Sequence, residues 1–188
     1  MKKEFREVLE DTPVIASIKD NEGLKHSLAS DIKIVFVLFG DICTIGSIVK
    51  TLKEAGKIVF VHLDLIGGIS AKEVSLDFIK EYTEADGIIT TKANLIKYAR
   101  QLGFITILRF FAMDSMAVSN IEKQLTSIQP DMIEVLPGVI PKVIAKVAKM
   151  SKAPVIAGGL ISDKEDIMTA LSGGAISVSA TNPDIWKM

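Results

Sequence analysis

The chain has 188 residues, a net charge of −1 and 48% hydrophobic residues. Domains commonly contain about 100–200 residues, so this length predicts one compact domain, residues 1–188, with a large core. The 22 basic and 23 acidic residues disfavour a strongly basic nucleic-acid binder, because phosphate contacts come mainly from clustered Lys and Arg. A nucleic-acid surface would have to be a local patch.

A mean hydropathy of +0.36 requires a check for membrane segments. The longest uncharged run, residues 167–183, is too short and too rich in Gly and Ser for a spanning helix, which needs about 20 mostly apolar residues. The first 13 residues are charged and lack the apolar stretch of a signal peptide. The single cysteine, Cys43, can form no intrachain disulfide and is interpreted as a buried, inert thiol. We therefore expect a cytoplasmic protein without a membrane segment.

Short apolar runs alternate with amphipathic segments along the whole chain. Successive runs start about 17–29 residues apart, which fits a strand followed by a crossover helix. No linker rich in Pro, Gly or Ser divides the chain. The eight predicted strands are residues 14–18, 34–39, 58–65, 87–90, 104–108, 132–136, 154–157 and 175–179.

The segments between the runs carry helix signals. Asp114 precedes apolar residues at helical spacing and predicts a helix cap. Ser162 and Glu165 predict a capping box at the start of a helix that Gly173 ends.

Eight such units predict an α/β protein, a compact (β/α)8 TIM-type barrel. Because barrels usually contain about 250 residues, the helices here must be short, and the last helix is truncated after Asn182. A doubly wound open sheet is the alternative. Its first turn often carries glycines, and the turn after the first predicted strand, residues 19–22, has none.

In a barrel of this type, functional groups gather at the C-terminal ends of the strands. His62 and Asp64 end the third run two residues apart, which predicts side chains on the same face at the mouth. They can serve ligand recognition or acid–base chemistry. Alternatively, they form a structural hydrogen bond with each other. His26, on the first predicted helix, is expected at the surface.

Two charged residues, Arg109 and Glu134, lie at or within apolar runs. A buried charge is costly unless it is paired. We expect these residues to pair with each other, to contact a polar ligand, or to do both.

The strongest binding signal lies after the last two predicted strands. Gly158-Gly159 follows the seventh, and Ser179, Ala180, Thr181 and Asn182 close the eighth. Barrels frequently bind phosphate at these two loops through backbone N–H groups, and glycine lets the backbone approach the anion. Two ordinary tight turns are the alternative.

The chain carries no HExxH, CxxC, Walker or nucleophile-elbow motif. With two His and one Cys, it predicts no metal site, no cofactor and no catalytic residue. Lys142, Lys146, Lys149 and Lys152 recur along one helix face. Such a face is usually a solvated surface, and the alternative is a track for RNA phosphates.

Several motifs resemble the glycerol uptake operon antiterminator family, also called the glycerol-3-phosphate-responsive antiterminators. The likeness covers nearly the whole chain in order. Its segments are Leu38–Ile42, His62–Ile69, Asp86–Lys92, Glu134–Gly138, Ala157–Ile161 and Trp186-Lys187. Gly67, where members often carry a longer polar residue, and the last strand, residues 177–181, depart from the family pattern.

This resemblance implies a regulator that binds glycerol-3-phosphate and acts on leader mRNA to prevent premature transcription termination. The effector phosphate would lie against the loops after the seventh and eighth strands. The glycerol hydroxyls would contact His62, Asp64 and Glu134, while Lys19 and Arg109 offset charge. Asp41, at the end of the second strand, is a further ligand candidate.

Two other functions stay open at this point. The first is an isomerase, lyase or synthase that acts on a small phosphorylated substrate, with His62 or Asp64 as base. The second is a barrel that binds no phosphorylated ligand and serves as a scaffold for partners. The residues do not determine the oligomeric state.

Overall fold

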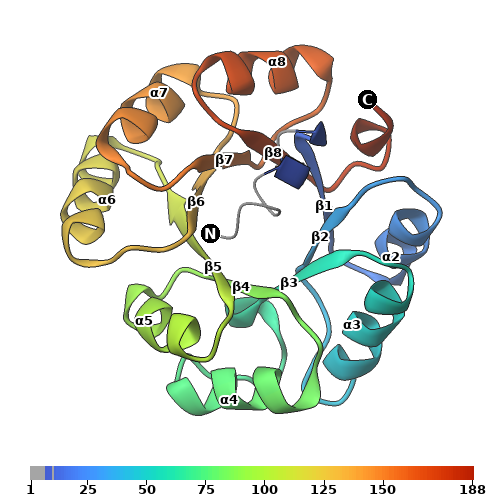
Figure 1. Ribbon diagram of the computed structural model, residues 1–188. Helices are drawn as coiled ribbons and strands as arrows, with labels where there is room; N and C mark the ends of the chain where they lie inside the picture. Colours follow the sequence, from blue (N-terminus) through green and yellow to red (C-terminus); the bar gives the residue numbers. More distant parts are fainter. Residues whose placement is uncertain (1–6, 10) are drawn as a thin grey trace.

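The computed structural model describes residues 7–9 and 11–188, so most of the charged N-terminal segment lies outside the described residues. Eight parallel strands, hydrogen-bonded in chain order, close into a barrel (Figure 1). This confirms the (β/α)8 barrel and excludes the open sheet. The strands are β1 (Val14–Ile18), β2 (Ile34–Val37), β3 (Ile58–His62), β4 (Gly87–Thr90), β5 (Ile105–Phe111), β6 (Met132–Leu136), β7 (Val155–Gly158) and β8 (Ser177–Ala180).

A helix follows each of the first seven strands and covers the outside of the barrel (Figure 1). After β8 the chain forms only a short 3-10 turn, η2 (Ile185–Lys187). This confirms the prediction that the last helix is truncated. None of the described helices is long and apolar enough to cross a membrane. The helices are α2 (Asn21–Leu28), α3 (Ile45–Glu54), α4 (Glu73–Tyr82), α5 (Ala93–Gln101), α6 (Ser115–Ser127), α7 (Pro141–Met150) and α8 (Lys164–Ser172).

The strands are buried on both faces, which explains why they appear in the sequence as continuous apolar runs. Alternate side chains divide into two clusters, one between strands and helices and one inside the barrel. Leu9, which is fully buried, belongs to the inner cluster, so the segment before β1 contributes to the barrel interior. The inner members on the strands are Ile15, Ile34, Phe36, Phe60, Ile89, Ile107, Met132 and Ile156.

Aspartate side chains cap three of the helices. Asp20, Asp114 and Asp163 each accept a hydrogen bond from a backbone N–H three residues later. The cap at Asp114 was predicted. For α8 the predicted capping box at Ser162 is wrong by one residue, because Asp163 is the cap. The side chain of Asp166 accepts hydrogen bonds from the backbone N–H and the hydroxyl of Ser162.

Several predicted boundaries also change. β3 ends at His62, and the 3-10 turn η1 (Leu63–Leu65) replaces its predicted last residues. β5 extends to Phe111 and therefore contains Arg109. Cys43 is exposed, not buried, because it lies in the loop after β2 beyond the packed strands.

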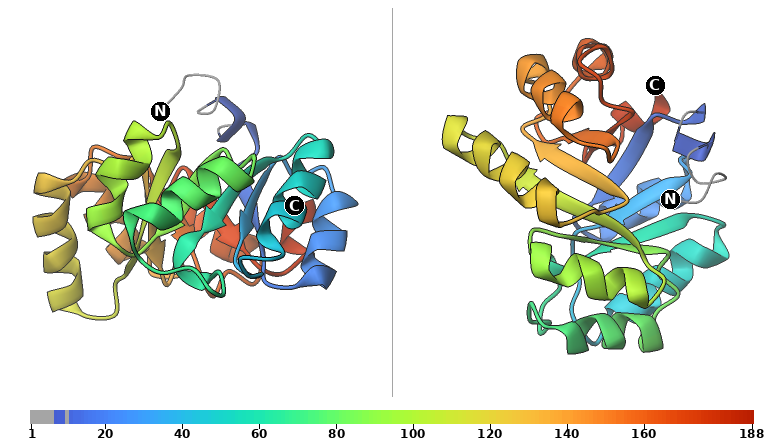
Figure 2. Two further views of the ribbon diagram at one scale, coloured as in Figure 1. Left: turned by 90° about the horizontal axis from the view of Figure 1, so that it is seen from below. Right: turned by 60° about the vertical axis from the view of Figure 1, so that its left-hand side comes forward.

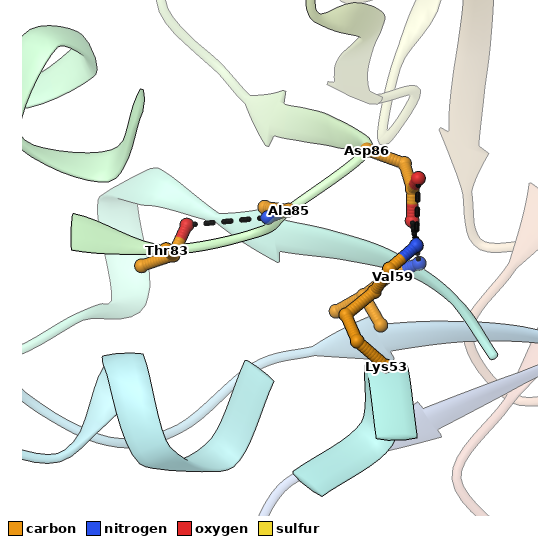
Figure 3. A network of polar contacts seen from close by, with 5 residues as sticks. All are labelled: Lys53, Val59, Thr83, Ala85 and Asp86. Carbon is orange, nitrogen blue, oxygen red and sulfur yellow. Dashed lines mark hydrogen bonds and ion pairs between the residues drawn. The ribbon is translucent and has the colours of Figure 1, made fainter. Parts of the chain in front are cut away.

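Carboxylates tie neighbouring strands together at the N-terminal end of the barrel. Asp86 accepts hydrogen bonds from the backbone N–H of Val59, at 2.8 Å, and from Lys53 Nζ, at 2.7 and 2.8 Å (Figure 3). Asp131 accepts in the same way from the backbone and hydroxyl of Thr106. These contacts link β3 to β4 and β5 to β6 at the end opposite the predicted site.

Helix α6 lies at the outer edge of the molecule in both views of Figure 2 and packs beside α7. Of its 13 residues, only Val118 and Ile121 are buried.

Gly87 allows the inner cluster to pack, and this generates a stability prediction. A Cβ at Gly87 would lie 2.4 Å from the backbone oxygen of Ile105 and 2.4 Å from Cε1 of Phe60. We expect Gly87→Ala to lower the free energy of unfolding by about 3 kcal/mol through overpacking. At Gly56 a Cβ would have no atom within 4 Å, although φ is +73°. Gly56→Ala should therefore lower the free energy of unfolding by only about 1 kcal/mol. Urea unfolding of both variants tests this, and equal losses contradict it.

Candidate functional site

A layer of buried polar side chains lies just above the inner apolar cluster, at the C-terminal end of the barrel. Ser17, His62, Arg109 and Glu134 each follow a member of the inner cluster by two residues on the same strand. Ser179 joins them, because its strand register places it beside Ile15 and Gly158. Sequence reasoning missed Ser17, since a strand that is apolar on both faces gives no sign of which residues face inward.

Three members of this layer form one hydrogen-bonded network. Arg109 and Glu134 are register partners on β5 and β6, and Arg109 Nε donates to Glu134 Oε2 over 2.6 Å. The hydroxyl of Ser179, on β8, donates to Glu134 Oε1 over 2.6 Å. The predicted pairing is confirmed, and it joins three strands across the mouth.

Gly158 makes room for this network. A Cβ on Gly158 would lie 2.6 Å from both Glu134 Oε1 and Ser179 Oγ. The glycine is therefore required by side-chain packing at the end of β7, a reason that the sequence interpretation of a phosphate loop did not include.

Arg109 still has unused hydrogen-bond donors. Its side chain is 8% exposed, and only Nε has a hydrogen-bond partner among the described residues. Among the described residues, Nδ1 of His62 is the only fully enclosed side-chain nitrogen or oxygen without a hydrogen-bond partner. Nη1 and Nη2 of Arg109 therefore reach the accessible surface of the mouth and have no acceptor among residues 7–9 and 11–188.

His62 is buried, with 2% of its surface exposed. Its Nδ1 is enclosed and has no hydrogen-bond partner among the described residues. Burial, with help from the positive charge of Arg109, lowers its pKa to about 4, and Asp64 opposes this shift. The imidazole is therefore neutral at physiological pH and can both donate and accept a hydrogen bond.

The predicted placement of Asp64 beside His62 on one strand is wrong, because Asp64 lies in η1. Its carboxylate accepts hydrogen bonds from Thr90 Oγ1 at 2.6 Å and from the backbone and hydroxyl of Thr91 at 2.7 Å. Burial alone would raise the pKa of Asp64, but these hydrogen bonds outweigh burial and lower it. The alternative interpretation, a His62–Asp64 hydrogen bond, is not found among the described contacts, and Asp64 anchors the end of β4 to the end of β3.

The two remaining candidates near β1 and β2 are exposed. Lys19 follows β1 directly. Asp41 accepts hydrogen bonds from the backbone of Cys43 and from the backbone and hydroxyl of Thr44. These bonds, the one from the Thr44 hydroxyl most of all, lower the pKa of Asp41. Asp41 also forms a backbone bridge with Gly67, so it holds together the loops after β2 and β3.

The loops predicted to bind phosphate lie at the same end of the barrel. Gly159 and Leu160 are consecutive left-handed residues, with φ of +77° and +63°, and Leu160 is 74% exposed. Such a backbone is uncommon for leucine, and no sequence signal indicated it. After β8, Thr181 and Asn182 are exposed, while the backbone oxygen of Ala180 accepts from Trp186 Nε1. Phosphate binding at these loops stays a prediction.

Three of the four lysines lie on the exposed face of α7, opposite buried Ile144 and Val147. Lys142, Lys146 and Lys149 belong to this set. Lys152 is exposed too, but it lies beyond the end of the helix at Met150, so its predicted place on the helix is wrong.

Breaking the buried ion pair is expected to destabilise the protein. Glu134→Gln leaves Arg109 buried without its counter-charge, and we expect a loss of about 3 kcal/mol in the free energy of unfolding. The matched control is Glu54→Gln, in an exposed pair with Lys50 at 3.9 Å, which should cost less than about 0.5 kcal/mol. Chemical denaturation measures both, and similar losses contradict the prediction.

The lowered pKa of His62 predicts a pH dependence. The unfolded chain binds a proton at His62 near its ordinary pKa of 6.5, whereas the folded protein does so only near 4. The free energy of unfolding therefore falls as the pH drops from 6.5 to 4, by about 3 kcal/mol for this group. We expect His62→Gln to remove this part of the acid sensitivity. Unfolding measured at pH 7, 5.5 and 4.5 tests it, and parallel pH profiles of the two proteins refute it.

Solved structures of other proteins share the fold of this chain. A glycerol uptake operon antiterminator regulatory protein from Listeria monocytogenes matches with a TM-score of 0.90 and 32% identity over 94% of this chain and 95% of that chain. A glycerol uptake operon antiterminator-related protein from Thermotoga maritima matches with a TM-score of 0.84 and 35% identity over 94% and 99%. A deoxyribose phosphate aldolase from Aeropyrum pernix, with a TM-score of 0.72 and 12% identity, covering 95% and 88%, shares the fold alone.

Sequence comparison extends the likeness. An uncharacterised Escherichia coli protein, YgcP, is 47% identical over 181 residues, which are 96% of this chain and 95% of that protein. Residues 14–186, from the first strand to the last turn, match the glycerol-3-phosphate responsive antiterminator family. The chain therefore belongs to the glycerol-3-phosphate responsive antiterminator family.

Proposed function

We propose that this protein is a cytoplasmic regulator that binds glycerol-3-phosphate, then binds leader mRNA and prevents premature transcription termination in glycerol-use operons. The family match over residues 14–186 carries the proposal. The barrel mouth supports its ligand half, because a buried arginine there retains unused donors beside a neutral histidine.

The phosphate of the ligand is assigned to the loops after β7 and β8, which border the buried network. Gly159 has a left-handed backbone, and Ser179 to Asn182 lead into the last turn. Lys19, exposed at the end of the neighbouring strand β1, can offset charge on the phosphate. Backbone N–H groups and a nearby cation are the usual partners of phosphate in barrels of this kind.

The RNA half of the proposal is assigned to the lysine face of α7. Lys142, Lys146 and Lys149 are exposed along one side of the helix, and Lys152 follows on the next loop. In a protein with a net charge of −1, such a local cluster is the type of surface that can contact RNA phosphates.

An enzyme acting on a phosphorylated substrate is the second candidate. A neutral, buried His62 at the mouth favours it, because such an imidazole can accept a proton. Against it, the carboxylate oxygens of Asp64 and Glu134 are all occupied by hydrogen bonds. This leaves His62 without a free carboxylate partner at the mouth.

Calorimetric titration with glycerol-3-phosphate tests the ligand assignment, with glycerol and inorganic phosphate as controls. We expect saturable binding that is at least about tenfold weaker in Gly159→Asp, because a carboxylate repels the phosphate. Gly159→Asn is the matched control, since Asn and Asp tolerate the left-handed backbone similarly. If both variants weaken binding equally, the phosphate does not bind at this loop. Turnover of a phosphometabolite panel, lost in His62→Ala, would favour the enzyme instead.

RNA binding is tested with the leader transcript of the protein's own operon. We expect ligand-loaded protein to bind it with an affinity that falls as salt rises, because lysine–phosphate contacts release counterions. Replacing Lys142, Lys146 and Lys149 with Gln should weaken binding and flatten the salt dependence. Lys80 and Lys97, exposed on α4 and α5, provide a control pair. If ligand-loaded protein shows no salt-sensitive binding, the regulator proposal fails.

A further inference from the structure

The mouth of the barrel presents hydrogen-bonding nitrogens that have no partner in the part of the chain that the structure describes. Nη1 and Nη2 of Arg109 have no acceptor among the described residues, and Nδ1 of His62 is enclosed without a partner there. Both side chains are more than nine-tenths buried. A buried polar atom without a partner is unfavourable, and this applies to Nδ1 of His62. Together with the accessible Nη1 and Nη2 of Arg109, it indicates a place where a ligand supplies the missing atoms.

This part of the mouth is balanced in charge. Glu134, whose side chain is 1% exposed, lies against Arg109 at 2.6 Å and offsets the guanidinium charge. His62 is neutral because of its burial and its position near Arg109. The open nitrogens can therefore bind an oxygen through hydrogen bonds, but they offer no net positive charge to compensate an anion.

Protein donors already hold both nearby carboxylates. Oε1 and Oε2 of Glu134 accept from Ser179 and Arg109. Both oxygens of Asp64 accept from Thr90 and Thr91. Glu134 and Asp64 therefore act as positioning residues here, and the open contacts come from Arg109 and His62.

We infer that Arg109 and His62 bind the uncharged, hydroxyl-bearing end of the ligand, and that this end of the site selects polyol phosphates over phosphorylated carboxylates. The inference rests on the proposed function, in which the loops after β7 and β8 hold the phosphate. A carboxylate at the same place would lie close to Glu134, and repulsion between like charges in a buried site is costly.

Four ligands test this selection on the unmodified protein by calorimetry. Glycerol-3-phosphate is the reference. 3-Phosphoglycerate replaces its terminal hydroxymethyl group with a carboxylate, and the two propanediol monophosphates each lack one hydroxyl. We expect about 100-fold weaker binding of 3-phosphoglycerate, and about 10- to 100-fold weaker binding of at least one propanediol phosphate through a lost hydrogen bond.

Glu134→Gln provides the decisive variant, because it removes the negative charge at nearly constant shape. The preference for glycerol-3-phosphate over 3-phosphoglycerate should shrink by at least about tenfold, since Arg109 can then pair with the ligand carboxylate. Glu54→Gln, in an exposed pair on α3, should leave the preference unchanged. Circular dichroism checks that each variant is folded.

His62→Phe gives a second test that does not depend on Glu134→Gln folding. This variant should reduce the penalty for at least one missing hydroxyl, while His62→Gln, which keeps a donor and an acceptor, should retain part of it.

The outcomes separate the two proposals. If glycerol-3-phosphate binds and 3-phosphoglycerate binds equally well, the inference is wrong and the proposed ligand stands. If the preference exists but is unchanged in Glu134→Gln and in His62→Phe, these residues do not cause it and the inference is also wrong. If none of the four ligands binds, the proposed function fails and the inference fails with it.

Discussion

The buried ion pair between Arg109 and Glu134 is the constraint on which the mouth of this barrel depends. Two charges removed from water need close contact and further hydrogen bonds to be tolerated. Here the contact is 2.6 Å, and Ser179 provides an additional hydrogen bond to the carboxylate. The pair requires β5 and β6 to be in one register, and it requires glycine at position 158 to leave space for the carboxylate.

The rest of the site follows from this arrangement. Glu134 holds Arg109 through Nε alone, so the other guanidinium nitrogens face the mouth. The positive charge of Arg109, added to burial, keeps His62 neutral. The carboxylate of Asp64 is held by Thr90 and Thr91, and its bonds tie the end of β3 to the end of β4.

A fold shared with aldolases does not conflict with membership of a family of regulators. The likeness to the Aeropyrum pernix enzyme is at 12% identity and concerns the barrel alone, and one barrel scaffold supports many functions through its strand ends and loops. In this chain, a charge-balanced network and two consecutive left-handed residues, Gly159 and Leu160, border the mouth.

The sequence by itself determined the eight strands and their order, because apolar runs of this kind need burial on both faces. It offered the pairing of Arg109 with Glu134 as one alternative, because a buried charge needs a partner. It could not determine which strand residues face inward, since continuous apolar strands hide the alternation; Ser17 was missed for this reason. Nor could it show that the chain turns into η1 after His62, which moves Asp64 off the strand and onto Thr90 and Thr91. Such contacts join residues about 26 positions apart, and only closure of the barrel brings them together.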